Sequence, residues 1–111
     1  MGQPTGLTDN ERAALRQLKE ILSQELGSVA LSLFGSKARG QAALDSDVDV
    51  MIEIPELNPE IESRIDDVIF EINLRYDVLI SAILFGRKEL EDGPLAESPL
   101  YKSVEKDGIR L

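Results

Sequence analysis

The sequence predicts a single α+β domain (α/β-like in its element order) that covers residues 1–111. Two observations lead to this prediction. The length of 111 residues fits one domain. Helical and strand patterns also alternate along the chain, in the order helix, strand, turn, strand, helix, strand, helix. The hydrophobic fraction of 42% is ordinary for a folded protein, so we expect a core of modest stability.

Residues 8–26 are predicted to form the first helix. Thr8 and Glu11 have the spacing of a capping box, and Gly27 is suited to end the helix. Apolar residues recur between them at helical spacing and would form the buried stripe: Leu15, Leu18, Ile21, Leu22 and Leu26.

Two strands and a turn are predicted next. Residues 29–34 form a short apolar run bounded by glycines, which indicates a buried strand. Residues 35–40 are predicted to be a turn that can open into one helical turn. Residues 48–54 are the second predicted strand.

The second long helix is predicted to start with Asn58 as its cap and Pro59 in its first position, and to end near Leu74. Its inner face would carry Ile61, Ile65, Val68, Ile69 and Ile72. A third strand is predicted over residues 76–84.

Two short helical pieces are predicted in the last part of the chain, over residues 87–91 and 99–106. Ser98 is the expected cap of the second piece. The apolar side chains available to dock this part are Leu95, Leu100, Tyr101 and Val104.

Composition excludes several classes of function. The chain has no cysteine and no histidine, so any bound metal needs oxygen ligands, which favours Mg²⁺, Mn²⁺ or Ca²⁺. The net charge of −9 disfavours direct binding of nucleic acid and suits a basic protein partner. The sequence has no apolar run of membrane-spanning length and no pattern of a signal peptide, so we expect a cytoplasmic protein that does not bind membranes.

The most informative stretch is Leu-Phe-Gly-Ser-Lys-Ala-Arg-Gly at residues 33–40, where a predicted buried strand ends in a turn. Gly35 has no Cβ, so the backbone can approach a ligand closely. Ser36 adds a hydroxyl beside free amide groups, which suits phosphate. Arg39 offers a forked donor to phosphate oxygens, and Gly40 permits a second tight bend.

Asp47 and Asp49 lie two residues apart at the start of the second predicted strand, so both should point to one face. Their Cα atoms would be roughly 6.6 Å apart, which suits carboxylates that share metal ions in phosphoryl transfer. Asp77 opens the third predicted strand. If that strand lies beside the second, Asp77 can complete a carboxylate triad and orient or deprotonate an attacking hydroxyl.

Each of these features has a simpler explanation when taken alone. A Gly-Ser pair is usually only a turn, an Asp-x-Asp pair is often a solvated edge, and Lys37 could equally touch phosphate or face water. Glu53 shares the face of Asp49 but is interpreted as a residue outside the ligand set. The remaining candidates are assigned to loop, solvent or packing: Asp45, Ser46, Asp66, Asp67, Tyr76 and Tyr101. Together, a Gly-Ser turn after a buried strand, an Asp-x-Asp pair on the next strand and an acidic residue on the third favour a catalytic site over these simpler explanations.

The run from Phe34 to Gly40 together with Ser-Asp-Val-Asp at residues 46–49 resembles the signature of the polymerase-β-like nucleotidyltransferase superfamily. The chain is similar over nearly its whole length to the shortest branch, the minimal nucleotidyltransferases of bacteria and archaea. The resemblance implies a small mixed β-sheet packed with helices. It also implies an enzyme that uses ATP as substrate and two Mg²⁺ ions.

The resemblance assigns a role to each motif residue. Gly35 and Ser36 would hold the triphosphate, and Lys37 and Arg39 would belong to the nucleotide-binding group. The ligands of the two Mg²⁺ ions would be Asp47 and Asp49, with Asp77 as the third carboxylate beside the acceptor hydroxyl.

Proteins of this branch are often encoded beside a HEPN-domain ribonuclease toxin, which implies an antitoxin that transfers AMP to a tyrosine of that partner. No separate substrate-binding domain is visible, so a second protein would supply the acceptor. Two alternatives remain open at this stage. The chain could mask the toxin without catalysis, or it could be the subunit of an enzyme that modifies a small molecule such as an aminoglycoside.

Overall fold

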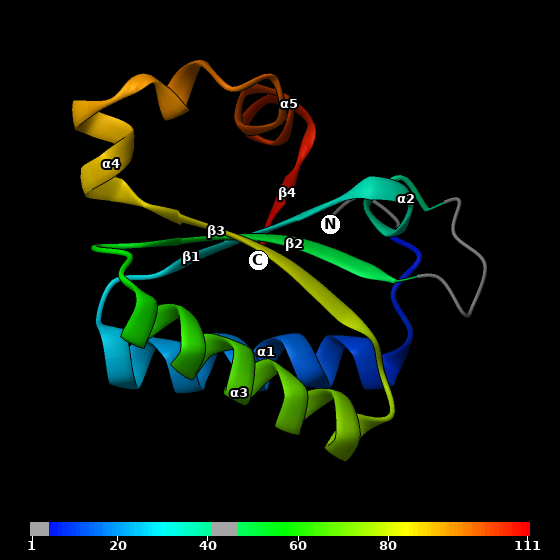
Figure 1. Ribbon diagram of the computed structural model, residues 1–111. Coiled ribbons are helices and arrows are strands. Elements are labelled where there is room, and N and C mark those ends of the chain that lie inside the picture. Colours follow the sequence, from blue (N-terminus) through cyan, green and yellow to red (C-terminus); the bar gives the residue numbers. More distant parts are fainter. Residues whose placement is uncertain (1–4, 41–46) are drawn as a thin grey trace.

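The computed structural model describes residues 5–40 and 47–111 (Figure 1). The elements are α1 (Asp9–Leu26), β1 (Ala30–Phe34), α2 (Gly35–Ala38), β2 (Val48–Ile54), α3 (Pro59–Tyr76), β3 (Ile80–Gly86), α4 (Arg87–Asp92), the 3₁₀ helix η1 (Pro94–Glu97), α5 (Pro99–Asp107) and β4 (Ile109–Arg110).

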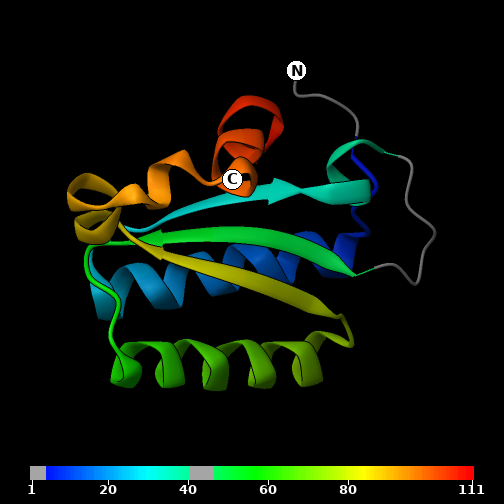
Figure 2. The same ribbon diagram turned by 45° about the horizontal axis from the view of Figure 1, so that its top comes forward.

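The strands form one mixed sheet in the order β3-β2-β1-β4. Strand β1 is antiparallel to both β2 and β4, whereas β2 and β3 are parallel and are joined by the crossover helix α3. Helices α1 and α3 cover one face of this sheet, and the short helices α4 and α5 lie on the other side (Figures 1 and 2). The predicted α+β class and the mixed sheet are confirmed.

The start of α1 confirms the predicted capping box. The Thr8 hydroxyl accepts a hydrogen bond from the Glu11 amide at 3.1 Å, and the Thr8 amide donates to Glu11 Oε1 at 2.9 Å. These bonds satisfy two amide groups that would otherwise have no partner at the start of a helix. Gly27 follows the last turn with a φ of 84°, which a residue with a side chain rarely adopts.

Helix α3 begins as predicted, because the Asn58 side chain accepts from the Ile61 amide at 2.9 Å. Its end differs from the prediction. The helix continues to Tyr76, and β3 begins only at Ile80. The Asn73 side chain explains the difference, because it accepts a hydrogen bond from the Ile80 amide at 2.9 Å and donates to the Ile80 carbonyl at 3.3 Å. The turn between helix and strand is thereby fixed inside the segment predicted to be strand.

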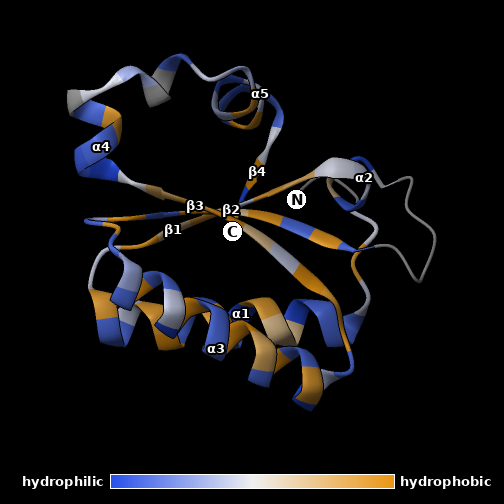
Figure 3. Cartoon of the chain, viewed as in Figure 1, coloured by the Kyte–Doolittle hydropathy of each residue, from blue (hydrophilic) through white to orange (hydrophobic). Residues whose placement is uncertain are grey.

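The core lies mainly between the sheet and helices α1 and α3. Four alternate residues of β2 are fully buried on that face: Val48, Val50, Ile52 and Ile54. A smaller cluster on the opposite face contains Met51, Phe85, Leu90 and Val104, with Tyr101 packed against it. Figure 3 shows the largely hydrophobic strands beside helices that alternate hydrophobic and hydrophilic residues. No helix within residues 5–40 and 47–111 is long and apolar enough to cross a membrane.

Two elements of the last part of the chain were not expected. They are the 3₁₀ helix η1 and the two-residue strand β4, which pairs with β1. The docking expected of Val104 and Tyr101 is confirmed, whereas Leu100 remains 40% exposed.

Candidate functional site

The Gly-Ser turn follows β1 directly and lies against the second strand. Gly35 begins α2 with a φ of 74°, and a Cβ built there would be only 2.6 Å from Asp49 Oδ2. Asp49 comes to this position because β2 pairs with β1 so that Asp49 is opposite Phe34. The missing Cβ at Gly35 therefore lets the turn lie against the Asp49 carboxylate.

Asp47 and Asp49 flank Val48, which is fully buried in the core. Asp49 is half-buried and Asp47 is exposed. Burial raises the pKa of the Asp49 carboxyl, and the nearby negative charge of Asp47 raises this pKa further. A bound cation would relieve this repulsion, and carboxylate oxygens are the ligands that Mg²⁺ prefers. The two aspartates thus fit a divalent cation in donor type and in charge.

Ser36 and Arg39 belong to the turn that Gly35 begins. Ser36 is half-buried in α2, and its carbonyl accepts a hydrogen bond from the Arg39 amide at 3.2 Å. The Arg39 residue is exposed, and Gly40 has a φ of 71°, as the predicted second bend requires. Ser36 therefore follows the glycine that lies against Asp49, and Arg39 lies at the exposed end of the same turn.

A cavity of about 230 Å³ opens between this turn and α5. Gly35 and Arg39 line it from the turn, and Ser103 and Asp107 line it from α5. The pattern of the sequence did not single out the last two residues, because α5 comes to the turn only through the pairing of β4 with β1.

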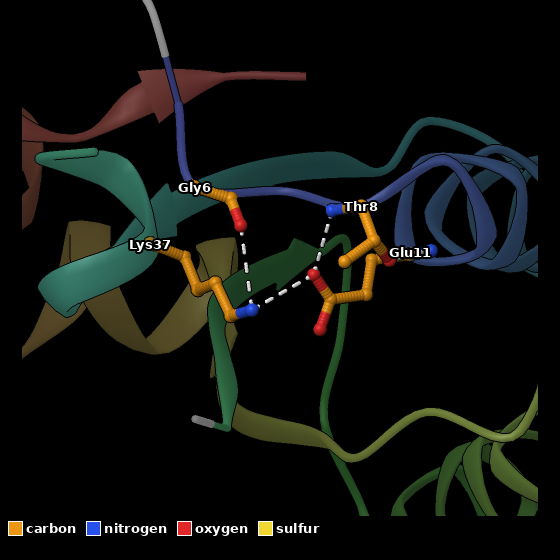
Figure 4. Close-up of polar contacts among 4 residues, drawn as sticks. All are labelled: Gly6, Thr8, Glu11 and Lys37. Atoms are coloured by element: carbon orange, nitrogen blue, oxygen red, sulfur yellow. Dashed lines mark hydrogen bonds and ion pairs between the residues drawn. The ribbon is translucent and has the colours of Figure 1, made fainter. Parts of the chain in front are cut away.

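Lys37 does not have the place that was predicted for it. Its side chain is fully buried, and its ammonium lies 3.0 Å from Glu11 Oε1 and 3.3 Å from the Gly6 carbonyl (Figure 4). An ammonium group enclosed in this way is turned into the protein and is not available to a nucleotide. The structure therefore corrects the assignment of Lys37 to the nucleotide-binding group.

Asp77 does not join the two aspartates. It caps α3 in the left-handed conformation, with a φ of 54°, and is exposed three positions before β3 begins. Within residues 5–40 and 47–111, no group of three acidic residues is arranged to hold a metal ion. The predicted triad is thus corrected to a pair, because the helix extends through the residues predicted to open the strand.

Ser81 occupies the position beside Asp49 on the third strand, since β2 and β3 pair with Asp49 next to Ser81. Neighbouring residues in register point to the same face of a sheet, and Ser81 is exposed. The sequence analysis missed this residue. The signal in the sequence that could have found it is a polar residue, Ser81, inside the apolar run of residues 78–85.

The other acidic and aromatic assignments agree with the structure where it describes them. Glu53 shares the face of Asp49 but lies 9% exposed, with its carboxylate 3.9 Å from the Arg87 guanidinium. Tyr101 packs edge-on against Phe85, with ring centroids 5.3 Å apart. The remaining residues are exposed or pack against the core, namely Asp66, Asp67 and Tyr76. Asp45 and Ser46 lie outside the described residues.

A Gly-Ser turn held against an aspartate pair on a mixed sheet defines a small domain suited to a metal ion and a phosphorylated ligand. The chain belongs to the nucleotidyltransferase domain family, which matches residues 15–110. The predicted family is thereby confirmed.

The chain is also similar to relatives with two different names, one of which is named as a protein adenylyltransferase. The chain is 38% identical over 74 residues to "Putative protein adenylyltransferase MJ0141" of Methanocaldococcus jannaschii, covering 65% of this chain and 72% of that protein. It is 34% identical over 103 residues to "Ribosomal protein L11 methyltransferase" of Thermosipho melanesiensis, covering 86% of this chain but only 37% of that protein.

The fold is similar to that of a chain described as "Structure of putative minimal nucleotidyltransferase", with a TM-score of 0.62 and 21% sequence identity. The match covers 94% of this chain and 97% of the other. It supports the architecture and the order of the elements.

Proposed function

We propose that this protein is a cytoplasmic enzyme that transfers AMP from ATP to a hydroxyl group on a partner protein. The observation that supports this most strongly is the contact between the Gly35 turn and the Asp49 carboxylate, with Asp47 two residues away. This arrangement sets a phosphate-binding turn beside two carboxylates, which is what metal-dependent phosphoryl transfer needs.

Asp47 and Asp49 would hold Mg²⁺, in the two-ion form implied by the family resemblance. When bound, the ions would neutralise charge on the phosphates and supply electrophilic assistance to the reaction. Without the ions, burial and the charge of Asp47 make the ionised form of Asp49 unfavourable, as the raised pKa of its carboxyl indicates. The residues of this chain would therefore bind Mg²⁺ and nucleotide together, each compensating the charge of the other.

The turn residues would bind and orient the triphosphate. The Ser36 hydroxyl and neighbouring amide groups can donate to phosphate oxygens. Arg39 can donate a forked pair of hydrogen bonds from its exposed position. Asp77 is not assigned as a metal ligand in the proposal, because it caps α3 and forms no metal-binding group of three acidic residues among the described residues.

The acceptor is proposed to be a tyrosine of a HEPN-type ribonuclease toxin, with this protein as its antitoxin. Three considerations support this acceptor. One relative carries the name of a protein adenylyltransferase, the resemblance to minimal nucleotidyltransferases implies such a partner, and the net charge of −9 suits a basic protein surface.

The experiment that tests the proposal is transfer of label from α-³²P-ATP in the presence of Mg²⁺. The protein would be purified from its host with whatever protein co-purifies, beside the Asp47→Asn/Asp49→Asn variant. We expect a labelled partner band with the native protein and none with the variant. A native complex that remains unlabelled, although its partner stays bound, would refute the catalytic proposal.

A second candidate function is masking of the partner without catalysis. The strongly acidic composition favours it, because a ribonuclease surface is often basic. Masking would survive the Asp47→Asn/Asp49→Asn substitution, since the two neutral residues alter a charge of −9 only modestly. Partner inhibition that persists in the unlabelled variant would therefore favour masking.

A further inference from the structure

The buried contact between Glu11 and Lys37 connects the start of α1 to the Gly35 turn (Figure 4). We call Glu11 and Lys37, with the backbone groups of Gly6 and Thr8 that they bind, the α1–α2 tether. Glu11 Oε1 accepts from the Lys37 ammonium at 3.0 Å and from the Thr8 amide at 2.9 Å. Glu11 and Lys37 are 26 residues apart in the sequence.

The backbone completes the tether. The Lys37 ammonium also donates to the Gly6 carbonyl at 3.3 Å, and the Gly6 amide donates to the Lys37 carbonyl at 2.7 Å. The side chain and the main chain of Lys37 are thus both bound to the segment that precedes α1. This leaves α2 little freedom to shift relative to α1.

The pair is enclosed by protein. The Lys37 side chain is 0% exposed and the Glu11 side chain 6% exposed. A buried ion pair is a weak source of net stability, because removing both charges from water costs about as much as their attraction returns. Separating Glu11 from Lys37 is nevertheless strongly unfavourable, because each charge would then be left unpaired in the protein interior. We therefore expect the tether to determine the position of the turn more than the stability of the fold.

Helix α2 needs such external support. It has only four residues, and no side chain caps its start. A helix this short does not persist through its own hydrogen bonds. Its first residue is Gly35, whose left-handed φ of 74° lets the turn lie against Asp49. The turn consequently lies against Asp49 at Gly35 and is held by Glu11 at Lys37.

We propose that Glu11 and Lys37 are positioning residues for nucleotide binding, which hold the Gly35–Ala38 turn in the shape that receives the triphosphate. The inference rests on the proposed function, because the turn is taken to bind phosphate. Neither residue touches the nucleotide. Their contribution acts through the backbone of the turn and through the orientation of Ser36.

The test compares a Glu11→Met/Lys37→Met double variant with the native protein. Replacing both charges by apolar side chains leaves no unpaired buried charge, so the double variant is expected to fold. Because this variant also removes the acceptor of the Thr8 amide, Thr8→Ala tests the capping box alone and is expected to keep native ATP affinity.

Glu25→Met/Arg64→Met is the control for the loss of an ion pair between two elements, because that exposed pair joins α1 and α3 at 2.7 Å and lies away from the turn. The readouts are binding of ATP with Mg²⁺ by calorimetry and hydrogen exchange of the amides of residues 35–40.

We expect ATP affinity to fall at least about tenfold in the Glu11→Met/Lys37→Met variant, a loss of about 1.4 kcal/mol of binding free energy. Amide exchange in residues 35–40 should accelerate, and the control should match the native protein in both readouts. A folded double variant with native ATP affinity would overturn the positioning role. A native protein that binds no ATP would refute the proposed function itself, and the inference with it, whatever the exchange rates.

Discussion

The two faces of strand β2 serve different purposes. On one face, Val48, Val50, Ile52 and Ile54 are fully buried beneath α1 and α3. The other face carries Asp49 near the start of the strand and Met51 farther along, in the smaller cluster covered by the C-terminal helices. The first face makes the sheet stable. The second leaves one end open, so a charged residue can be held there by a rigid strand without being enclosed.

The comparison shows that a strand fixed by the core on one face can carry a reactive side chain on the other face without weakening the core. Asp49 is flanked in sequence by Val48 and Val50, so its backbone is fixed by the core even though its side chain is directed away from it. Substitutions on the two faces should consequently separate into effects on activity and effects on stability.

The largest effect is expected on the open face. Asp47→Asn/Asp49→Asn should lower the proposed AMP transfer by at least about 10³-fold, or about 4 kcal/mol of activation free energy, because the proposed metal ligands would be lost. The measurement is label transfer to the partner at saturating Mg²⁺.

The stability of this variant should not fall at pH 7. The pKa of Asp49 is raised in the folded state, so ionisation of this carboxyl lowers the free energy of unfolding as the pH rises from the ordinary value of 3.8 through the raised pKa. A neutral Asn does not ionise and avoids that loss. A variant that unfolds well below the native midpoint would mean that the aspartates are structural.

On the buried face, Ile52→Ala should lower the free energy of unfolding by about 2–5 kcal/mol, because it leaves a cavity in the main core. Urea denaturation measures this loss. Transfer activity per folded molecule should remain native. Activity that falls while the fold is intact would show that the two faces are coupled.

The turn that adjoins the open face is expected to respond at an intermediate level. Gly35→Ala forces a side chain into the left-handed region and against Asp49 Oδ2, at a cost of roughly 1–2 kcal/mol. Both ATP affinity and the midpoint of thermal unfolding should decrease. Gly27→Ala is the control, because Gly27 also has a positive φ but a Cβ there would meet nothing within 4 Å. That variant should lose stability and keep its ATP affinity.

The smallest effect is expected where α1 and α3 meet outside the core. Hydrogen bonding to Arg64 lowers the pKa of the exposed Glu25 carboxyl. Its contribution to stability is therefore present above the ordinary value of 4.5 and is lost as the pH falls through the lowered pKa. Glu25→Gln should lower the thermal midpoint slightly at pH 7 and not at pH 3. An equal decrease at both pH values would rule out the ion pair as its source.

Much of the fold could be predicted because the relevant signals are local. The Thr8 capping box, the Asn58 cap and the limits of β2 all follow from neighbouring residues, and the structure agrees with each. The start of β3 could not be predicted in the same way. It depends on the Asn73 side chain binding the backbone of Ile80, and an asparagine in that position has no distinctive local pattern.

Some parts of the candidate site could likewise be predicted from local motifs, whereas others depend on tertiary packing. The proximity of Gly35 and Asp49 could be inferred from two short motifs on strands that follow each other in the sequence and pair in the sheet. The position of the Lys37 side chain instead depends on Glu11 in another helix. A lysine inside a phosphate-binding motif is expected to face the ligand, and only tertiary packing reveals that it faces the core. Asp77 was misplaced for a related reason, because the length of α3 determines its conformation.

The pairing of β4 with β1 has a consequence for the order of folding. Leu33 is matched with Ile109, so one edge of β1 has no partner until nearly all of the chain is available. During synthesis, α1, β1 and β2 can associate early, but the exposed edge must wait for the last segment. This long-range pairing should make closure of the sheet a late and comparatively slow event. A nascent chain stalled before residue 109 would carry an open strand edge that invites association with other chains.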